Sequence, residues 1–283
     1  MVTQLRIALV ILIFYLTPFF GTCAPLQVAT SFHPLDQFIR EVGGEDISVS
    51  ILVDSGADPH VFELKPSHMR LVASSDLLLL LGLGIEFWAE GIAERYAEKI
   101  HYLYPNPSDV GRESDYFDQH VWLDPQRVRE MTDKIRDLLC EVRPVSCRAF
   151  FDRSQKFLHT LELFDLETRS EILRWEVKRF IALHPAWGHF ARRYGLDQGG
   201  GIRERHDDEP SVKEVADLLK FARSQSINIV FVESDSAKEQ VRALLSGSHV
   251  RIVEVDPLGR AGRDYFDYMC ENVSRMAVAM RKG

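Results

Sequence analysis

The stretch "RAFFDRSQKFLHTLELFDLETRSEILRWEVK", residues 148–178, decides the fold of this chain. Its pattern is helical throughout, and nothing in it has the alternation of a strand. At 1.5 Å per residue, a helix of about 30 residues spans about 45 Å. That length is enough to run down the side of two lobes, so we predict that this helix joins the two halves of the chain.

Short β-type runs alternate with helical runs on both sides of this stretch. Before it, the expected strands are residues 26–32, 47–53, 76–81 and 101–104, and the expected helices include 34–44, 66–75 and 85–98. After it, the expected strands are 179–183, 227–232 and 250–255, and the expected helices are 186–195, 210–225, 235–247 and one from about residue 263. Such alternation is typical of parallel sheets built from βαβ units. We predict an α/β fold with two lobes, each a mostly parallel sheet flanked by helices.

The two halves are not separated by a Gly/Ser-rich or Pro-rich segment, so the connection is the helix itself rather than a flexible linker. The predicted organisation is a signal peptide, an N-terminal lobe, a linking helix and a C-terminal lobe, at residues 1–24, 25–147, 148–178 and 179–283.

The first residues have the layout of a secretory signal. Arg6 precedes an apolar run at residues 7–16, and Pro18 and small residues follow. The run is shorter than the roughly 20 apolar residues of a membrane-spanning helix, so we expect cleavage near residue 24 or 25 and a periplasmic protein. Lipid attachment at Cys23 is the alternative, although "FGTC" matches a lipid-attachment pattern poorly.

Composition limits the classes of partner. The hydrophobic fraction of 46% is that of a globular protein with a proper core. The net charge of −8 and the lack of a basic stripe argue against nucleic acid, because its binders need clustered Lys and Arg. A cationic partner fits better.

If the chain is exported, its cysteines can form disulfides, since an oxidising compartment permits them. Cys140 and Cys147 flank a turn-like segment and either form a staple between two helix ends or stay separate thiols. Cys270 lies in the last expected helix, and we expect it to be buried and free.

Four polar residues lie where ligand sites occur in open α/β sheets, beyond the carboxyl ends of strands or at the start of the next helix. They are His60, His120, His184 and Asp256. Three imidazoles and one carboxylate suit Zn²⁺, with bonds of about 2.0 to 2.2 Å, and Mn²⁺ accepts the same donors. Spacing alone is a weak signal, because the four are scattered over most of the chain.

The sequence around these residues is more specific. Five blocks, in order from about residue 26 to the C-terminus, resemble the zinc- and manganese-binding receptors of bacterial ABC importers, the ZnuA/TroA-like solute-binding proteins of cluster A-I type. The blocks are "DSGADPHVFELKPSHMRLVASSDLLLLLGLGIEFW", "FDQHVWLDPQRV", "ALHPAWGHFARRYGL", "DEPSVKEVADL" and "VDPLG".

The resemblance implies a fold and a function. The metal ligands of the family fall on His60, His120, His184 and Asp256 of this chain, two from each lobe, with the metal site in the interlobe cleft and a rigid backbone helix between the lobes. It also implies a monomer that captures a divalent metal ion and hands it to an ABC permease in the inner membrane.

Departures from the family pattern bear on the metal. Segment 105–119 is short and lacks histidine where zinc receptors often carry a His-rich loop, which leaves manganese and iron open as cargo. His184 favours zinc, since some manganese receptors have Glu there. Trp187 replaces the usual Phe, Gln119 stands where Pro is common, and His189 stands where Tyr is common. We expect His189 to serve as an ordinary helix residue rather than as a spare ligand or as a hydrogen-bond donor to a group behind the ligands.

The other histidines have simpler interpretations. We expect His33 to be a hydrogen-bonded polar residue, and His68, His101, His159 and His249 to be surface residues. The segment around His206, "RERHDDEPS", is either the acidic start of a helix or a loop that attracts cations at the edge of the cleft.

The ligand set favours capture over catalysis. If all four groups coordinate the ion, no position remains for the activated water of a hydrolase. Two alternatives stay open: a secreted zinc hydrolase in which Asp256 acts as base, and a surface adhesin that uses a metal only for structure. A His-Glu-x-x-His segment is absent from the sequence, which counts against the hydrolase.

Overall fold

The computed structural model describes residues 24–54, 57, 59–105, 118–201, 211–244, 250–259 and 263–281. The expected signal peptide with Cys23, the segment around His206, and His249 lie outside the described residues. Within the described ranges, the chain forms no helix with the length and apolar character needed to cross a membrane.

The N-terminal lobe is built on a four-stranded parallel sheet with the order β2-β1-β3-β4. The strand β3 consists of four leucines that are all buried, as expected for an inner strand covered on both faces. The elements are β1 (Leu26–Thr30), α2 (His33–Gly43), β2 (Ile47–Ile51), α3 (Pro66–Ser74), β3 (Leu77–Leu80), α4 (Glu90–Ala93) and β4 (Ile100–Tyr102).

The C-terminal lobe repeats this arrangement with the order β6-β5-β7-β8, again all parallel. Its elements are β5 (Arg179–Ala182), α8 (Gly188–Tyr194), β6 (Asp197–Gly201), α9 (Val212–Ser224), β7 (Ile229–Val232), α10 (Asp235–Leu244), β8 (Arg251–Glu254) and α11 (Tyr265–Met280). The predicted fold class of two mostly parallel α/β lobes is therefore confirmed.

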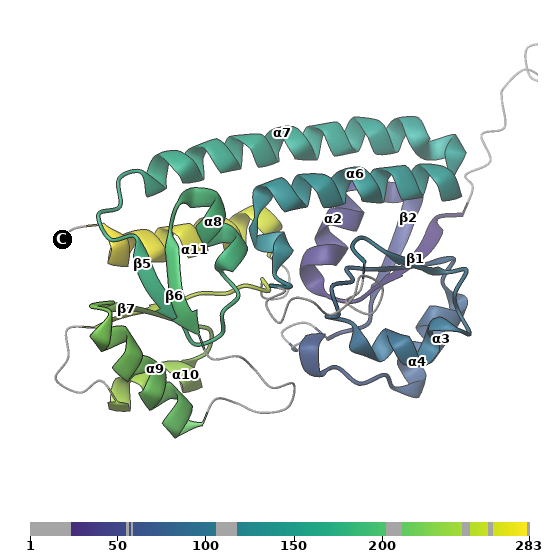
Figure 1. The fold of residues 1–283 in the computed structure, drawn as a ribbon. Coiled ribbons are helices and arrows are strands. Elements are labelled where there is room, and N and C mark those ends of the chain that lie inside the picture. The colour runs from purple at the N-terminus through teal and green to yellow at the C-terminus, as the bar shows by residue number, and fades with distance from the viewer. Residues whose placement is uncertain are drawn as a thin grey trace, which may run out of the picture.

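A pair of long helices lies along one side of the molecule, and the second of the two joins the lobes (Figure 1). They are α6 (Pro125–Val142) and α7 (Cys147–Ile172), which lie side by side, with α7 running along both lobes (Figure 1). The side chain of Asp124 caps α6 by accepting a hydrogen bond from Gln126 N at 2.9 Å. The disulfide between Cys140 and Cys147 closes the turn between the two helices, so the staple is the correct one of the two alternatives that the sequence left open.

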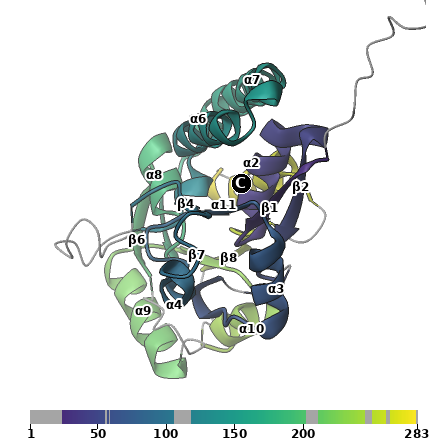
Figure 2. The same ribbon diagram turned by 90° about the vertical axis from the view of Figure 1, so that its right-hand side faces the viewer.

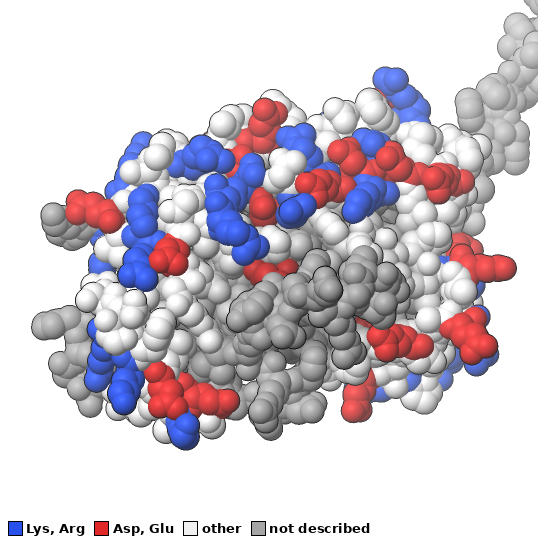
Figure 3. Space-filling view, in the orientation of Figure 1, with Lys and Arg blue, Asp and Glu red and all other residues white. Residues whose placement is uncertain are grey.

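The layers can be followed in two views. The helices α6 and α7 lie together on one side of the molecule, and α3, α4, α9 and α10 lie on the opposite side (Figures 1 and 2). On the face drawn in Figure 3, basic and acidic side chains intermingle along α6 and α7. Short-range pairs such as Arg148 with Asp152 at 3.0 Å contribute to this pattern.

One apolar core extends through both lobes. It includes Val28 of β1, Met131 of α6, Phe157 of α7, Phe180 of β5 and Met269 of α11, each no more than 4% exposed. Because apolar surface from both sheets is buried in the same cluster, separating the lobes would expose it to water at a cost of about 25 cal/mol per Å². The core therefore holds the two halves of the candidate site at a defined spacing.

Several local expectations are wrong. The linking helix ends at Ile172 rather than at Lys178, and the helix expected at 85–98 is reduced to the single turn of α4 beside a short 3-10 segment at Phe87–Ala89. The strand β6 was not expected, because its sequence "DQGGG" has low strand propensity.

Two side chains also differ in burial from expectation. Cys270 is free as expected but exposed, because it lies on the outer face of α11 rather than toward the core. His68 is 8% exposed rather than on the surface, because its Nδ1 accepts a hydrogen bond from Lys65 N at 3.1 Å at the start of α3.

Candidate metal site

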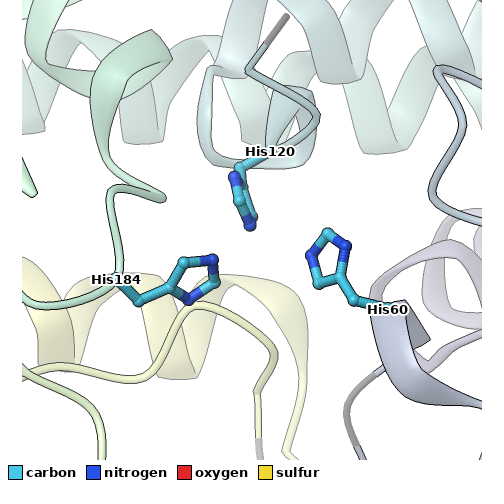
Figure 4. Close-up of side chains that lie close together, drawn as sticks. All are labelled: His60, His120 and His184. Carbon is cyan, nitrogen blue, oxygen red and sulfur yellow. The ribbon is translucent and has the colours of Figure 1, made fainter. Parts of the chain in front are cut away.

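Three of the four predicted ligands meet between the lobes. His60 lies in the 3-10 turn Pro59–Val61 after β2, His120 immediately precedes the 3-10 turn Val121–Leu123 that leads into α6, and His184 follows β5. The rings of all three point toward a common space, with His60 and His120 from one lobe and His184 from the other (Figure 4).

The distances fit a shared ion. One ring nitrogen from each histidine lies within 4.8 Å of the others, and the ring centroids of His120 and His184 are 4.6 Å apart. In a tetrahedral zinc site, nitrogens at about 2.0 Å from the metal lie roughly 3.3 Å from one another. A modest contraction of the cluster therefore brings the three imidazoles onto one ion.

His120 is held ready for a metal. Its backbone N and its Nδ1 both donate to Asp118 Oδ1, at 3.0 and 2.9 Å. Since a carboxylate only accepts, the proton lies on Nδ1, and the lone pair on Nε2 faces the site. His120 Nε2 is buried without a hydrogen-bond partner, as expected for a nitrogen whose partner is a metal ion.

Burial sets the charge of this pair. Burial lowers the pKa of His120, against the opposing effect of its hydrogen bond to Asp118, so the imidazole is neutral at physiological pH. Burial is the largest single effect on Asp118 and raises its pKa, but the hydrogen bonds from the ring and backbone of His120, with the electrostatic effects of His120 and His189, outweigh burial and lower the pKa overall. A neutral imidazole beside an ionised carboxylate is the form that ligates zinc.

His184 has a corresponding carboxylate in its own lobe. Its Nδ1 donates to Glu233 Oε2 at 3.0 Å, which again directs Nε2 toward the site. Glu233 directly follows β7, the strand next to β5. Its second oxygen, Oε1, is buried without a hydrogen-bond partner.

Asp256, the fourth predicted ligand, is not part of the three-histidine group. It follows β8 as predicted, but its Oδ1 accepts hydrogen bonds from Leu258 N and Gly259 N at 3.2 and 3.0 Å. Its loop nevertheless adjoins the His120 loop, because Trp122 Nε1 donates to Pro257 O at 2.6 Å. The structure thus brings the loop of Asp256 to the site without bringing its carboxylate into the histidine group.

The loops around the site are fixed by buried polar contacts. Gln119 Nε2 donates to Leu83 O at 2.9 Å, which ties the residue before His120 to the loop after β3. That loop is in turn held by Glu86, which accepts from Leu81 N, Gly82 N and Ser31 Oγ at 2.9, 2.9 and 2.6 Å. Burial raises the pKa of Glu86 to about 7.

Glycine has a structural role in the His184 loop. A Cβ at Gly201 of β6 would lie 2.7 Å from Pro185 Cβ and 2.9 Å from Ala182 O. The unexpected strand therefore carries glycine where the loop with His184 packs against it.

Two further histidines lie outside the three-histidine group and form hydrogen bonds of their own. His33 Nε2 lies 3.0 Å from Arg263 O, which confirms the expected hydrogen bond. His189 stays outside the histidine group, but it is not the ordinary helix residue expected, because its Nε2 donates to the main-chain oxygen of Asp118 at 2.8 Å and Asp118 in turn orients His120.

Asp118 and Glu233 were not among the site residues predicted from the sequence. Their positions in the sequence could have indicated both. Asp118 lies two residues before His120, and Glu233 stands at the carboxyl end of a predicted strand, as His184 and Asp256 do. The sequence does not reveal which histidine each carboxylate would orient, because that depends on how the strands are ordered in the sheet.

Comparisons with known proteins agree with this architecture. A family model described as ZnuA, the periplasmic component A of a zinc-uptake complex, matches residues 28–279. The zinc-binding protein AdcA of Streptococcus pyogenes serotype M3 is 24% identical over 286 residues, which cover 89% of this chain and 56% of AdcA. The chain thus spans about half the length of that relative.

Solved structures extend the likeness to the fold. A crystal structure of ZnuA has a TM-score of 0.75 at 26% identity, covering 90% of this chain and 98% of that one. The periplasmic zinc-binding protein TroA from Treponema pallidum has a TM-score of 0.79 at 21% identity, covering 91% and 100%. Both lobes and the helix between them are included in these matches.

Proposed function

The chain belongs to the ZnuA family of periplasmic zinc-uptake components, and we propose that it works outside the cytoplasmic membrane as a receptor. In this proposal it captures one divalent transition-metal ion, zinc in the first place, between its lobes. It then delivers the ion to an ABC permease. The proposal includes secretion through a cleaved signal at residues 1–24 and action as a monomer.

The observation that carries the proposal is the cluster of three histidines. His60, His120 and His184 converge from two lobes, and the buried Nε2 of His120 lacks a hydrogen-bond partner. Carboxylates on the Nδ1 atoms of His120 and His184 fix the tautomer in which Nε2 binds metal. We propose these three as ligands, and Asp256 as the fourth after its carboxylate turns from the amides of its own loop.

The donor set favours zinc. Three imidazoles are borderline donors that suit Zn²⁺, whereas Mn²⁺ prefers a larger share of oxygen ligands. Manganese and iron remain the alternative cargoes.

Capture is proposed over catalysis for a structural reason. Residues from both lobes surround the ion, and an Asp256 that completes the coordination leaves no place for an activated water. The shared core also keeps the empty protein folded, as delivery requires.

A competition titration tests the proposal. Metal-free protein is titrated with zinc and with manganese against a chromophoric chelator, and its unfolding is followed with and without metal. One tightly bound zinc per chain that excess manganese does not displace, in a protein that stays folded when empty, is the expected result. Metal-dependent ester or peptide hydrolysis would support the hydrolase instead, and unfolding on chelation would support a structural metal.

A further inference from the structure

Asp118 contacts both lobes at once. Its Oδ1 accepts the two hydrogen bonds from His120 described above, and its Oδ2 accepts one from His189 N, at the start of α8, at 3.2 Å. The main-chain oxygen of Asp118 also accepts from His189 Nε2 at 2.8 Å. One residue therefore connects a metal-facing histidine of the N-terminal lobe to a helix of the C-terminal lobe.

Gly188 makes room for this contact. A Cβ at that position would lie 2.5 Å from Asp118 Oδ2, closer than real Cβ atoms approach such an atom. The carboxylate of Asp118 can lie against the first turn of α8 only because position 188 has no side chain. Glu233 differs from Asp118 in this respect, since it orients His184 of its own lobe and makes no such contact in that role with the other lobe.

We propose that Asp118 is a positioning residue that couples the hold of His120 on the metal to the contact between the lobes, with Gly188 supplying the space it needs. The inference rests on the proposed function of metal capture. It has a specific consequence: a change in α8 that touches no ligand should alter metal affinity, and should do so through Asp118.

The test is a double-mutant cycle on zinc affinity. The variants are D118A, G188A, the double variant, and G91A as a matched control, because a Cβ at Gly91 of α4 meets nothing within 4 Å. We expect D118A and G188A each to weaken zinc binding by at least about tenfold, as is typical for residues that orient a ligand. G91A should bind as the wild type does.

Non-additivity decides whether Gly188 acts through Asp118. Once the carboxylate is gone, the added methyl group has space, so G188A should have almost no further effect in the D118A background. Wild-type affinity in G188A, or losses that simply multiply in the double variant, would overturn the inference. If D118A does not fold, D118S takes its place in the cycle, since the short serine side chain lacks the carboxylate and leaves the space beside Gly188 open.

Amide hydrogen exchange at His189 separates coupling from a local loss of ligand geometry. Zinc should slow this exchange in the wild type and in E233Q, and should fail to do so in D118A. Equal slowing in D118A would contradict the coupling. If the wild type bound no zinc, the proposed function would fail, and exchange in the metal-free proteins would test the contact between Asp118 and α8 by itself. Faster exchange at His189 in D118A and G188A than in G91A would support this contact. Equal exchange in all three variants would contradict it.

Discussion

The two lobes share one topology but build their halves of the site differently. In both sheets the first strand lies between the second and the third, and the fourth lies at the edge. In the C-terminal lobe, His184 and the carboxylate that orients it, Glu233, follow neighbouring strands of one sheet. In the N-terminal lobe, Asp118 orients His120 and is itself held by α8 of the other lobe. The second half-site is therefore self-contained, whereas the first is completed by contact between the lobes.

The largest expected effect comes from removing a proposed ligand of either half. H184A and H120A should each weaken zinc binding more than about 100-fold, because structural zinc sites gain roughly 10–16 kcal/mol from about four ligands. Zinc affinity is measured by chelator competition. If one of the two variants bound zinc as tightly as the wild type, the claim that both lobes contribute to the site would be contradicted. H159A, at an exposed position on α7, is the control.

Proton competition should be the next largest effect. Three histidines titrating at the ordinary value near 6.5 would cost about tenfold each at pH 5.5, about 1000-fold in all. Because burial lowers the pKa of His120, its neutral form persists to lower pH, and the loss at that residue is delayed. We expect zinc affinity to fall roughly 100-fold between pH 7.5 and 5.5. A pH-independent affinity would argue against imidazole ligands.

The self-contained half-site can be weakened without touching a ligand. E233Q should lower zinc affinity about tenfold, since the neutral amide oxygen of the new side chain would hold the Nδ1–H of His184 less strongly than a carboxylate does. Chelator competition measures the change. E239Q is the control, because Glu239 lies on the exposed face of α10 and pairs with Arg242. Equal affinities in the two variants would remove Glu233 from the site.

The smallest effect on affinity is expected at the disulfide. Replacing Cys140 and Cys147 by serine opens a short loop between α6 and α7. This loop lies at the end of α6 opposite to the one that His120 precedes. Stability in denaturant should fall by about 2 kcal/mol, while zinc affinity stays at the wild-type value. A loss of affinity would mean that the helix pair transmits strain to the site.

Much of this could be predicted from the sequence. Buried strands such as Leu77–Leu80 and the long helix have strong periodic patterns, and the three histidines of the candidate site lay in recognisable blocks. The glycine-rich β6 could not be predicted, because its place depends on close approach of the Pro185 loop rather than on strand propensity. The position of the Asp256 carboxylate also depends on hydrogen bonds within its own loop, which no sequence pattern specifies.

The most direct test of the central claim is anomalous diffraction at the zinc edge from crystals of the zinc-loaded protein. We expect one strong peak between the lobes, within about 2.1 Å of a nitrogen from each of His60, His120 and His184. For His120 and His184 that nitrogen should be Nε2. A zinc ion bound elsewhere, or one held from a single lobe, would contradict it.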